Sequence, residues 1–300
     1  MPNAKLFNYL LLHFIVFIWG FTAVLGALIS IDAIPLVWFR MLLASGFIFL
    51  WLAFRKERLR YPPKAIAAFC LSGFIIALHW LAFFGAIKVS NVSVTLAIMS
   101  TGAFFASLLE PLIYRRGIIW YEVLFGLLVI VGLYIIFEVE SEYILGISLA
   151  LCSSFLGALF SVLNGKLAIK YKASVISFYE IFFGMLCISV YLWFSGSFSS
   201  EFFQLSANDW VFLLVLASVC TAYAFIASIH VMKWISPYTV MLTINMEPVY
   251  GIILALLILG DSENMSSQFY YGAAIILVTV VANGIIKTSR ERKKRRLPNT

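Results

Sequence analysis

The stretch PYTVMLTINMEPVYGIILALLILG, residues 237–260, decides the class of fold to which this chain belongs. Its 24 residues include one acid, Glu247, and no base, and most of the others are apolar. A helix rises about 1.5 Å per residue, so this stretch is long enough to cross a lipid hydrocarbon core of about 30 Å. It therefore predicts a transmembrane helix.

The composition of the whole chain extends that interpretation. Hydrophobic residues make up 63% of it and charged residues 12%, whereas a soluble domain is about 45–50% apolar and about 25% charged. The strands of a membrane β-barrel would alternate apolar and polar residues over about ten positions, but the apolar runs here are longer and do not alternate. We therefore predict an all-α integral membrane protein.

Polar breaks divide the 300-residue chain into ten apolar runs of 19–24 residues. Each is a predicted transmembrane helix. The predicted helix cores are 8–29, 34–54, 65–87, 92–114, 119–137, 143–165, 174–194, 209–231, 237–260 and 268–287.

The distribution of Lys and Arg predicts how these helices are oriented. With the N-terminus in the cytoplasm, 19 of the 21 basic residues fall in cytoplasmic segments, one (Lys88) in an outer loop and one (Arg40) within a span. Cytoplasmic loops of membrane proteins carry such an excess. We therefore expect both termini in the cytoplasm. The basic tail from Lys287 to Arg296 directly follows a span, which favours contact with anionic lipid headgroups over nucleic acid.

The chain also repeats itself. A shift of 146 residues superimposes the third, fourth and fifth predicted spans on the eighth, ninth and tenth without a gap, and matches Ser90 with Ser236, Val94 with Val240, and Gly126 with Gly272. Each half has five spans, an odd number, so the halves have opposite orientations in the membrane. This inverted repeat is typical of secondary transporters, whose binding site lies near the midplane. We predict a first repeat at 1–137, a second at 138–287 and a basic tail at 288–300.

Short motifs add a family resemblance. Asn245-Met246-Glu247-Pro248-Val249-Tyr250, followed by Leu259-Gly260-Asp261, resembles the Glu-Pro-Val-Phe run and the terminal Leu-Gly-Glu of EamA-type members of the drug/metabolite transporter superfamily. Trp19-Gly20 resembles the Trp-Gly of that family's first helix. The resemblance covers nearly the whole chain and implies a permease that exports amino acids or other metabolites. The first half departs from it, with Thr101-Gly102-Ala103-Phe104 at the aligned positions and Arg115-Arg116 in place of the terminal acid.

Glu247 is the leading candidate for the transport pathway. It lies near the middle of its span, where an ionisable group costs about 2.5–3.5 kcal/mol on insertion scales and usually faces a cavity or a partner. Pro248 cannot donate a backbone hydrogen bond, which loosens the helix there. Glu247 could accept a proton or orient an amino group, or it could be a neutral residue bonded to a neighbouring helix. Asn245 precedes it in the same motif.

Two more ionisable residues lie within predicted spans. Arg40 could bind a substrate carboxylate through its planar fork, or extend to the outer headgroups. Glu180 lies at a similar depth measured from the inner face, so we expect no direct pair between it and Arg40. Both are candidates for the substrate or ion pathway.

Further candidates come from aromatic and polar residues within spans. His79 could bind a proton or be a neutral residue bonded to a neighbouring helix, and Trp80 and Trp19 accompany it as pathway candidates. Small-residue stripes that include Ser100 and Asn164 either line the path or let helices approach closely. Glu110 and Pro111 are expected at a helix exit, where Glu110 could pair with Arg115 and Arg116 or act as a gate.

Other function classes find less support. The motifs HExxH, GxSxG and the phosphate-binding Gly-rich loop are absent from the sequence, and the four cysteines lack CxxC spacing. We therefore expect no metal, no cofactor, no disulfide and no enzymatic activity. The predicted function is secondary transport of a small metabolite, such as an amino acid or amine, across the bacterial inner membrane, with export the expected direction. A lipid-moving protein of the same architecture is the alternative, and a membrane-embedded enzyme is a weaker one.

Overall fold

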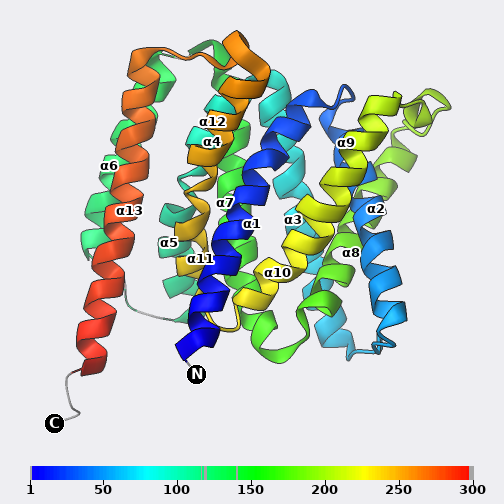
Figure 1. The fold of residues 1–300 in the computed structure, drawn as a ribbon, viewed down its shortest axis with the longest axis horizontal. Coiled ribbons are helices and arrows are strands. Elements are labelled where there is room, and N and C mark those ends of the chain that lie inside the picture. Colours follow the sequence, from blue (N-terminus) through cyan, green and yellow to red (C-terminus); the bar gives the residue numbers. More distant parts are fainter. Residues whose placement is uncertain (1, 116, 118–119, 140, 297–300) are drawn as a thin grey trace.

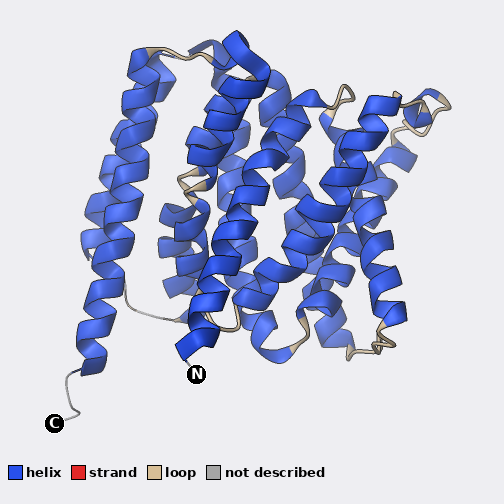
Figure 2. Cartoon of the chain, viewed as in Figure 1, coloured by secondary structure: helices blue, strands red, loops and turns tan. Residues whose placement is uncertain are grey.

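A computed structural model describes residues 2–296, except 116, 118–119 and 140. The described part of the chain consists of helices and their connections and has no strand (Figure 2). In chain order the α-helices are α1 (Pro2–Leu28), α2 (Ala33–Phe54), α3 (Pro63–Val89), α4 (Val92–Met99), α5 (Gly102–Tyr114), α6 (Trp120–Val139), α7 (Ile144–Lys170), α8 (Ala173–Phe194), α9 (Ala207–Ala217), α10 (Ala224–Val231), α11 (Pro237–Ile244), α12 (Glu247–Leu259) and α13 (Ser267–Arg296). Four short turns are η1 (Ser141–Tyr143), η2 (Glu201–Phe203), the π-helical turn η3 (Ser218–Tyr223) and η4 (Gly260–Glu263).

Eight helical segments within the described residues are long and apolar enough to cross a membrane. They are Leu6–Leu28, Ala33–Phe54, Pro63–Val89, Val92–Tyr114, Ile144–Lys170, Ala173–Phe194, Ala207–Val231 and Thr239–Glu263. Helices α6 and α13 pack together along one flank of the bundle (Figure 1), where Leu124–Ile136 of α6 is a shorter apolar stretch. An all-helical membrane fold is confirmed, while the count of ten spans stays a prediction.

Two of the spans are broken in the middle, and in the same way. The segment 92–114 consists of α4, with 8 residues, and α5, with 13, separated at Ser100 and Thr101. The segment 237–259 consists of α11, with 8 residues, and α12, with 13, separated at Asn245 and Met246. All four bounds of the second pair lie 145 residues after their counterparts, one fewer than the 146 expected. The two breaks are therefore equivalent positions of the repeat.

Hydroxyl groups satisfy the backbone at the first break. Ser100 Oγ donates to the Ala97 carbonyl at 2.5 Å and Thr101 Oγ1 to that of Ile98 at 2.8 Å. Ser154 Oγ of α7 lies 2.9 Å from Thr101 Oγ1 and donates to the Met99 carbonyl at 3.2 Å. Irregular backbone inside a membrane is tolerated only where such partners or a water-filled cavity replace the lost helical bonds.

Proline shapes the second break differently from our expectation. Pro248 was expected to loosen a continuous helix, but it occupies the first turn of α12, where a backbone N–H has no helical partner and its loss costs little. The backbone N–H groups of Asn245 and Met246 close the end of α11 by donating to Leu242 at 3.3 Å and Thr243 at 3.0 Å.

The start of α1 and the end of α13 lie at the same end of the bundle, here called the terminal end (Figure 1). The opposite, or loop, end is formed by residues 29–32, 90–91, 195–206 and 260–266. Cross-links hold the loop end together. The Asp209 carboxylate accepts from Ser30 N at 2.6 Å and Ser30 Oγ at 2.7 Å, and Lys88 Nζ donates to the Ile29 carbonyl.

A second loop-end contact joins the two repeats. The buried Glu263 carboxylate accepts from the backbone N–H groups of Val92 at 3.1 Å and Ser93 at 2.8 Å. These are orphan donors at the start of α4, where a helix dipole also favours negative charge. Asn91 Oδ1 accepts from the next donor, Val94 N, at 2.8 Å.

The described contacts at the terminal end include an exposed ion pair. Lys172 forms an exposed ion pair with Glu57 at 2.6 Å, and Tyr179 donates its hydroxyl to the Leu59 carbonyl. These contacts join the 55–62 connection to α8 and to the residue before it.

Candidate functional site

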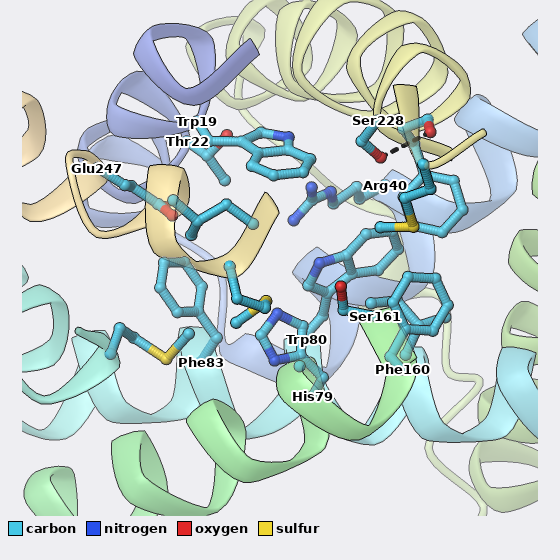
Figure 3. Close-up of a pocket in the computed structure, with 17 residues that line it drawn as sticks. Trp19, Thr22, Arg40, His79, Trp80, Phe83, Phe160, Ser161, Ser228 and Glu247 are labelled. Carbon is cyan, nitrogen blue, oxygen red and sulfur yellow. Dashed lines mark hydrogen bonds between the residues drawn. The ribbon is translucent and has the colours of Figure 1, made fainter. Parts of the chain in front are cut away.

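A central cavity of about 100 Å³ lies beside the second helix break (Figure 3). One water needs about 10–15 Å³ on the same measure, so the space admits a small ligand. Most of its wall is apolar or aromatic. Its polar members are drawn from both halves of the chain and are Trp19, Thr22, Arg40, His79, Trp80, Ser161, Ser228 and Glu247.

Arg40 is the cationic group of the cavity. Its side chain is 2% exposed, its Nε donates to Thr221 Oγ1 at 2.6 Å, and its guanidinium lies 4.0 Å from the Trp80 ring centroid. Stacking on tryptophan stabilises a desolvated guanidinium. Within the described residues, Nη1 has no hydrogen-bond partner. The side chain is therefore fixed on one side and keeps a donor available, and it points into the cavity (Figure 3).

The π-helical turn η3 positions two of these groups. A π-turn inserts one extra residue and shifts the side chains and carbonyls that follow it. Thr221 in this turn donates to the Leu216 carbonyl at 2.7 Å, five residues back, and accepts from Arg40. The neighbouring Cys220 carbonyl accepts from Trp19 Nε1 at 3.2 Å. The turn thus anchors both the arginine and one tryptophan of the cavity.

Glu247 lies in the first turn of α12 and is 8% exposed. It approaches the cavity from the wall formed by α12, and Arg40 from the wall formed by α2 (Figure 3). No ion pair within 4.0 Å joins these two described side chains. The two ionisable side chains therefore line the same cavity without direct contact, an arrangement that can accept the two ends of a dipolar ligand.

His79 is bonded to the neighbouring helix α7. Its Nδ1 lies 2.8 Å from the Ser153 carbonyl oxygen and 2.9 Å from Ser153 Oγ, so one residue of α7 contacts this nitrogen with two polar groups. The ring stacks on Phe83 and packs against Gly157, where an added Cβ would lie 3.0 Å from Cε1. The imidazole is thus held in one orientation at the edge of the cavity (Figure 3).

The remaining candidates lie elsewhere. Asn245 and Ser100 are buried at the two helix breaks, at equivalent positions of the repeat. Asn164 and Glu180 bond each other outside the cavity lining. Glu110 is buried in α5 beside Pro111, whose ring lies within that helix, and the expected contact with Arg116 lies outside the described residues. The structure therefore brings together Glu247, His79, Arg40, Trp19 and Trp80, but not these others.

Sequence reasoning missed several polar residues that the structure makes prominent. Thr22 and Ser161 line the cavity with hydroxyls that have no partner within the described chain. Thr221 positions Arg40, and Glu263 rather than the exposed Asp261 is the buried acid after α12. Of these residues, only Glu263 could have been singled out from the sequence, because an acid near the end of a span often caps another helix.

Paired helix breaks beside a cavity with a few polar groups, in a bundle of apolar helices, define a membrane transporter built from two repeats. Comparison with known proteins agrees with that class. The model of the EamA-like transporter family matches residues 6–138 and 144–284. The chain belongs to this family and is a multi-pass protein of the bacterial cell membrane.

Two further likenesses are informative. A Clostridium kluyveri protein described as an uncharacterized transporter is 23% identical over 250 residues, which cover 80% of this chain and 77% of that protein. A protein of known crystal structure aligns with a TM-score of 0.66 at 14% identity, over 92% of this chain and 97% of that one. At such identity this second likeness concerns the fold alone. Within the described residues, no three His, Cys, Asp or Glu side chains are grouped so as to hold a metal ion.

Proposed function

We propose that this chain is an alternating-access carrier that exports a small metabolite with a carboxylate and an amino group, such as an amino acid. The observation that carries the proposal is that a basic and an acidic side chain, Arg40 and Glu247, line one small aromatic cavity without direct contact. Each charge costs free energy in the membrane. A zwitterion would neutralise both, with its carboxylate on the Arg40 fork and its amino group on Glu247.

The shape of the site favours a compact ligand with an apolar side chain. Trp19, Trp80 and Phe83 contribute aromatic surface, while the hydroxyls of Thr22 and Ser161 offer additional hydrogen bonds. Hydrophobic walls with a few fixed polar groups are typical of small-molecule sites. In this proposal the polar groups orient the ligand and the walls select its size.

Alternation would use the two broken helices. In the proposed cycle the two predicted five-helix repeats rock against each other and expose the cavity first at one end and then at the other. The Glu263 and Asp209 contacts close the loop end, and the Lys172–Glu57 pair and the Tyr179 contact close the terminal end. Release of one set exposes the cavity to one side of the membrane. With the termini in the cytoplasm, the loop end faces outward.

The test is uptake and counterflow in proteoliposomes. The labelled panel contains amino acids, the amines that lack their carboxylate and the acids that lack their amino group. We expect saturable counterflow of an amino acid and weak movement of both truncated sets. Arg40→Gln should selectively weaken transport of compounds with a carboxylate, and Glu247→Gln of those with an amino group. Glu201→Gln is the matched control, because the Glu201 side chain is exposed and lies outside both the cavity and the proposed closing contacts.

Three outcomes would count against this function. Wild-type rates in both cavity variants would show that the charges do not bind the substrate. Accumulation of substrate only on the cytoplasmic side, under either gradient direction, would refute export. Folded protein that moves no panel compound but redistributes fluorescent lipids would support the lipid-moving alternative.

A further inference from the structure

A second polar pair lies in the membrane part of the bundle, outside the cavity lining. Glu180 of α8 and Asn164 of α7 are both 0% exposed. Asn164 Nδ2 donates to Glu180 Oε1 at 3.0 Å. An ionised carboxylate in such a place is strongly disfavoured unless several donors surround it, and this one has only uncharged neighbours in the described chain, the Asn164 amide and the Ser72 hydroxyl.

The two remaining oxygens of the pair lack a hydrogen-bond donor. Glu180 Oε2 and Asn164 Oδ1 are both buried, and neither has a hydrogen-bond partner in the described chain. An amide oxygen and an ionised carboxylate oxygen can each only accept. One proton on Oε2 turns this oxygen from an acceptor into a donor, and the pair then holds a donor that its unpartnered acceptors lack.

We propose that Glu180 is a proton-binding site of the transport cycle, protonated in this conformation and paired with Asn164. This inference rests on the proposed carrier function for its role but not for its chemistry. In the cycle, Glu180 binds a proton when it is exposed to one side of the membrane and releases it to the other side. The proton gradient thereby drives the movement of the metabolite.

The surroundings of Glu180 supply no counter-charge. Helices α2, α3, α7 and α10 pack against α8. The groups that face the carboxyl are uncharged, namely the Asn164 amide from α7 and the Ser72 hydroxyl from α3. The titratable groups of those helices have other surroundings. Arg40 and His79 line the cavity, Lys88 and Lys166 bond the Ile29 and Ile113 carbonyls, and His230 lies beside Lys233. Cys70 lies near Cys187 of α8, and Lys64, Cys152 and Lys170 are exposed.

A short connection leads from the pair to the cavity. Ser161 lines the cavity and lies three residues before Asn164 on α7, so the two side chains share one helix face. Ser161 Oγ is also buried and has no partner in the described chain. A hydroxyl both donates and accepts, so Ser161 can relay a proton between the cavity and the pair.

The backbone at Glu180 lies in a close crossing of two helices. A Cβ added at Gly73 of α3 would lie 2.4 Å from the Glu180 carbonyl oxygen, and one added at Gly184 would lie 2.7 Å from the Gly73 carbonyl oxygen. The backbones of α3 and α8 are therefore in direct contact at this level. Exposing Glu180 requires these helices to shift, which ties proton exchange to the conformational change.

The first test needs no substrate. Infrared absorption of the wild-type protein reconstituted at neutral pH should contain a protonated-carboxyl band that is reduced in Glu180→Gln. The amide that this substitution introduces would donate to Asn164 Oδ1 in place of the acid, so the variant retains the pair and should fold. Glu57→Gln should leave the band unchanged. An undiminished band in Glu180→Gln would overturn the proposal.

The second test measures coupling. In proteoliposomes, wild-type transport should be stimulated severalfold by a pH gradient, whereas Glu180→Gln should show a stimulation ratio near one with counterflow retained at equal pH. Wild-type stimulation in Glu180→Gln would overturn the coupling role. If wild-type protein moves no panel compound, the proposed function fails, while the infrared result still decides whether Glu180 holds a proton.

Discussion

Replacing Glu263 by Gln should open the loop end of the protein. In the structure this carboxylate accepts from two backbone N–H groups at the start of α4, at 3.1 Å and 2.8 Å, and is 2% exposed. It therefore joins the connection after α12, in the second half of the chain, to the broken span of the first half. Opening the loop end requires these two segments to separate.

The size of the effect follows from the bonds that are lost. A hydrogen bond to a charged group contributes about 1.5–3 kcal/mol. Glutamine has one acceptor oxygen and no charge, so it retains at most one of the two bonds in a weaker form. Since about 1.4 kcal/mol is a tenfold change in an equilibrium constant, the population with an open loop end should rise by about 10- to 100-fold.

The assay is thiol labelling of the cavity. Ser228 lines the cavity, and Ser228→Cys in a background without native cysteines reports access from the loop end to a membrane-impermeant reagent. Asp261→Asn is the matched control, because Asp261 lies on the same turn but is exposed, and its side chain accepts from Asn264 Nδ2 at 3.1 Å. Equal labelling rates in the Glu263 and Asp261 variants would refute the reasoning.

Three further predictions test the packing and the site. Gly73→Ala should destabilise the fold by about 1–3 kcal/mol, because the added Cβ meets the backbone of α8. Gly46→Ala is the control, since its Cβ meets nothing within 4 Å and the change should be neutral or stabilising by up to about 1 kcal/mol. Thermal unfolding in detergent compares the two variants, and equal midpoints would contradict the close crossing of α3 and α8. Lys56→Gly should raise the unfolding temperature, since Lys56 has a φ of 50° that costs a non-glycine residue about 1–2 kcal/mol, and a lower midpoint would contradict that strain. Thr221→Val removes the acceptor for Arg40 Nε and should raise the KM for carboxylate substrates about tenfold with little change for amines; an equal rise for both would indicate a general loss of structure.

Much of the fold could be read from the sequence, because the free energy of placing residues in lipid depends mainly on residue type. The predicted span at 34–54 corresponds to α2, and the one at 174–194 to α8. The breaks in 92–114 and 237–260 could not be read in this way. A hydropathy average is insensitive to two non-helical residues, and the hydroxyls that satisfy the first break include that of Ser154 on another helix. Tertiary contacts decide such breaks.

The candidate site was predictable as a set of residue types but not as a geometry. The cost of burying charge singled out Arg40 and Glu247, and both line the cavity. The same argument singled out Glu180, which lies outside that lining and bonds Asn164. Which charged residues share a cavity depends on helix packing, and the π-turn that carries Thr221 has no proline or glycine to mark it.

The distribution of charge between the halves gives the proposed mechanism its asymmetry. Arg40 comes from the first half and Glu247 from the second. The residue of the first half that is equivalent to Glu247 is Gly102, which has no acid. A ligand that binds both charges therefore bridges the two repeats and stabilises the arrangement in which they approach each other. A ligand with only one charge leaves the other buried without a partner, which disfavours that arrangement. Ligand binding thus favours the conformational change itself. A zwitterion should speed the reorientation of the cavity, while either truncated analogue should slow it.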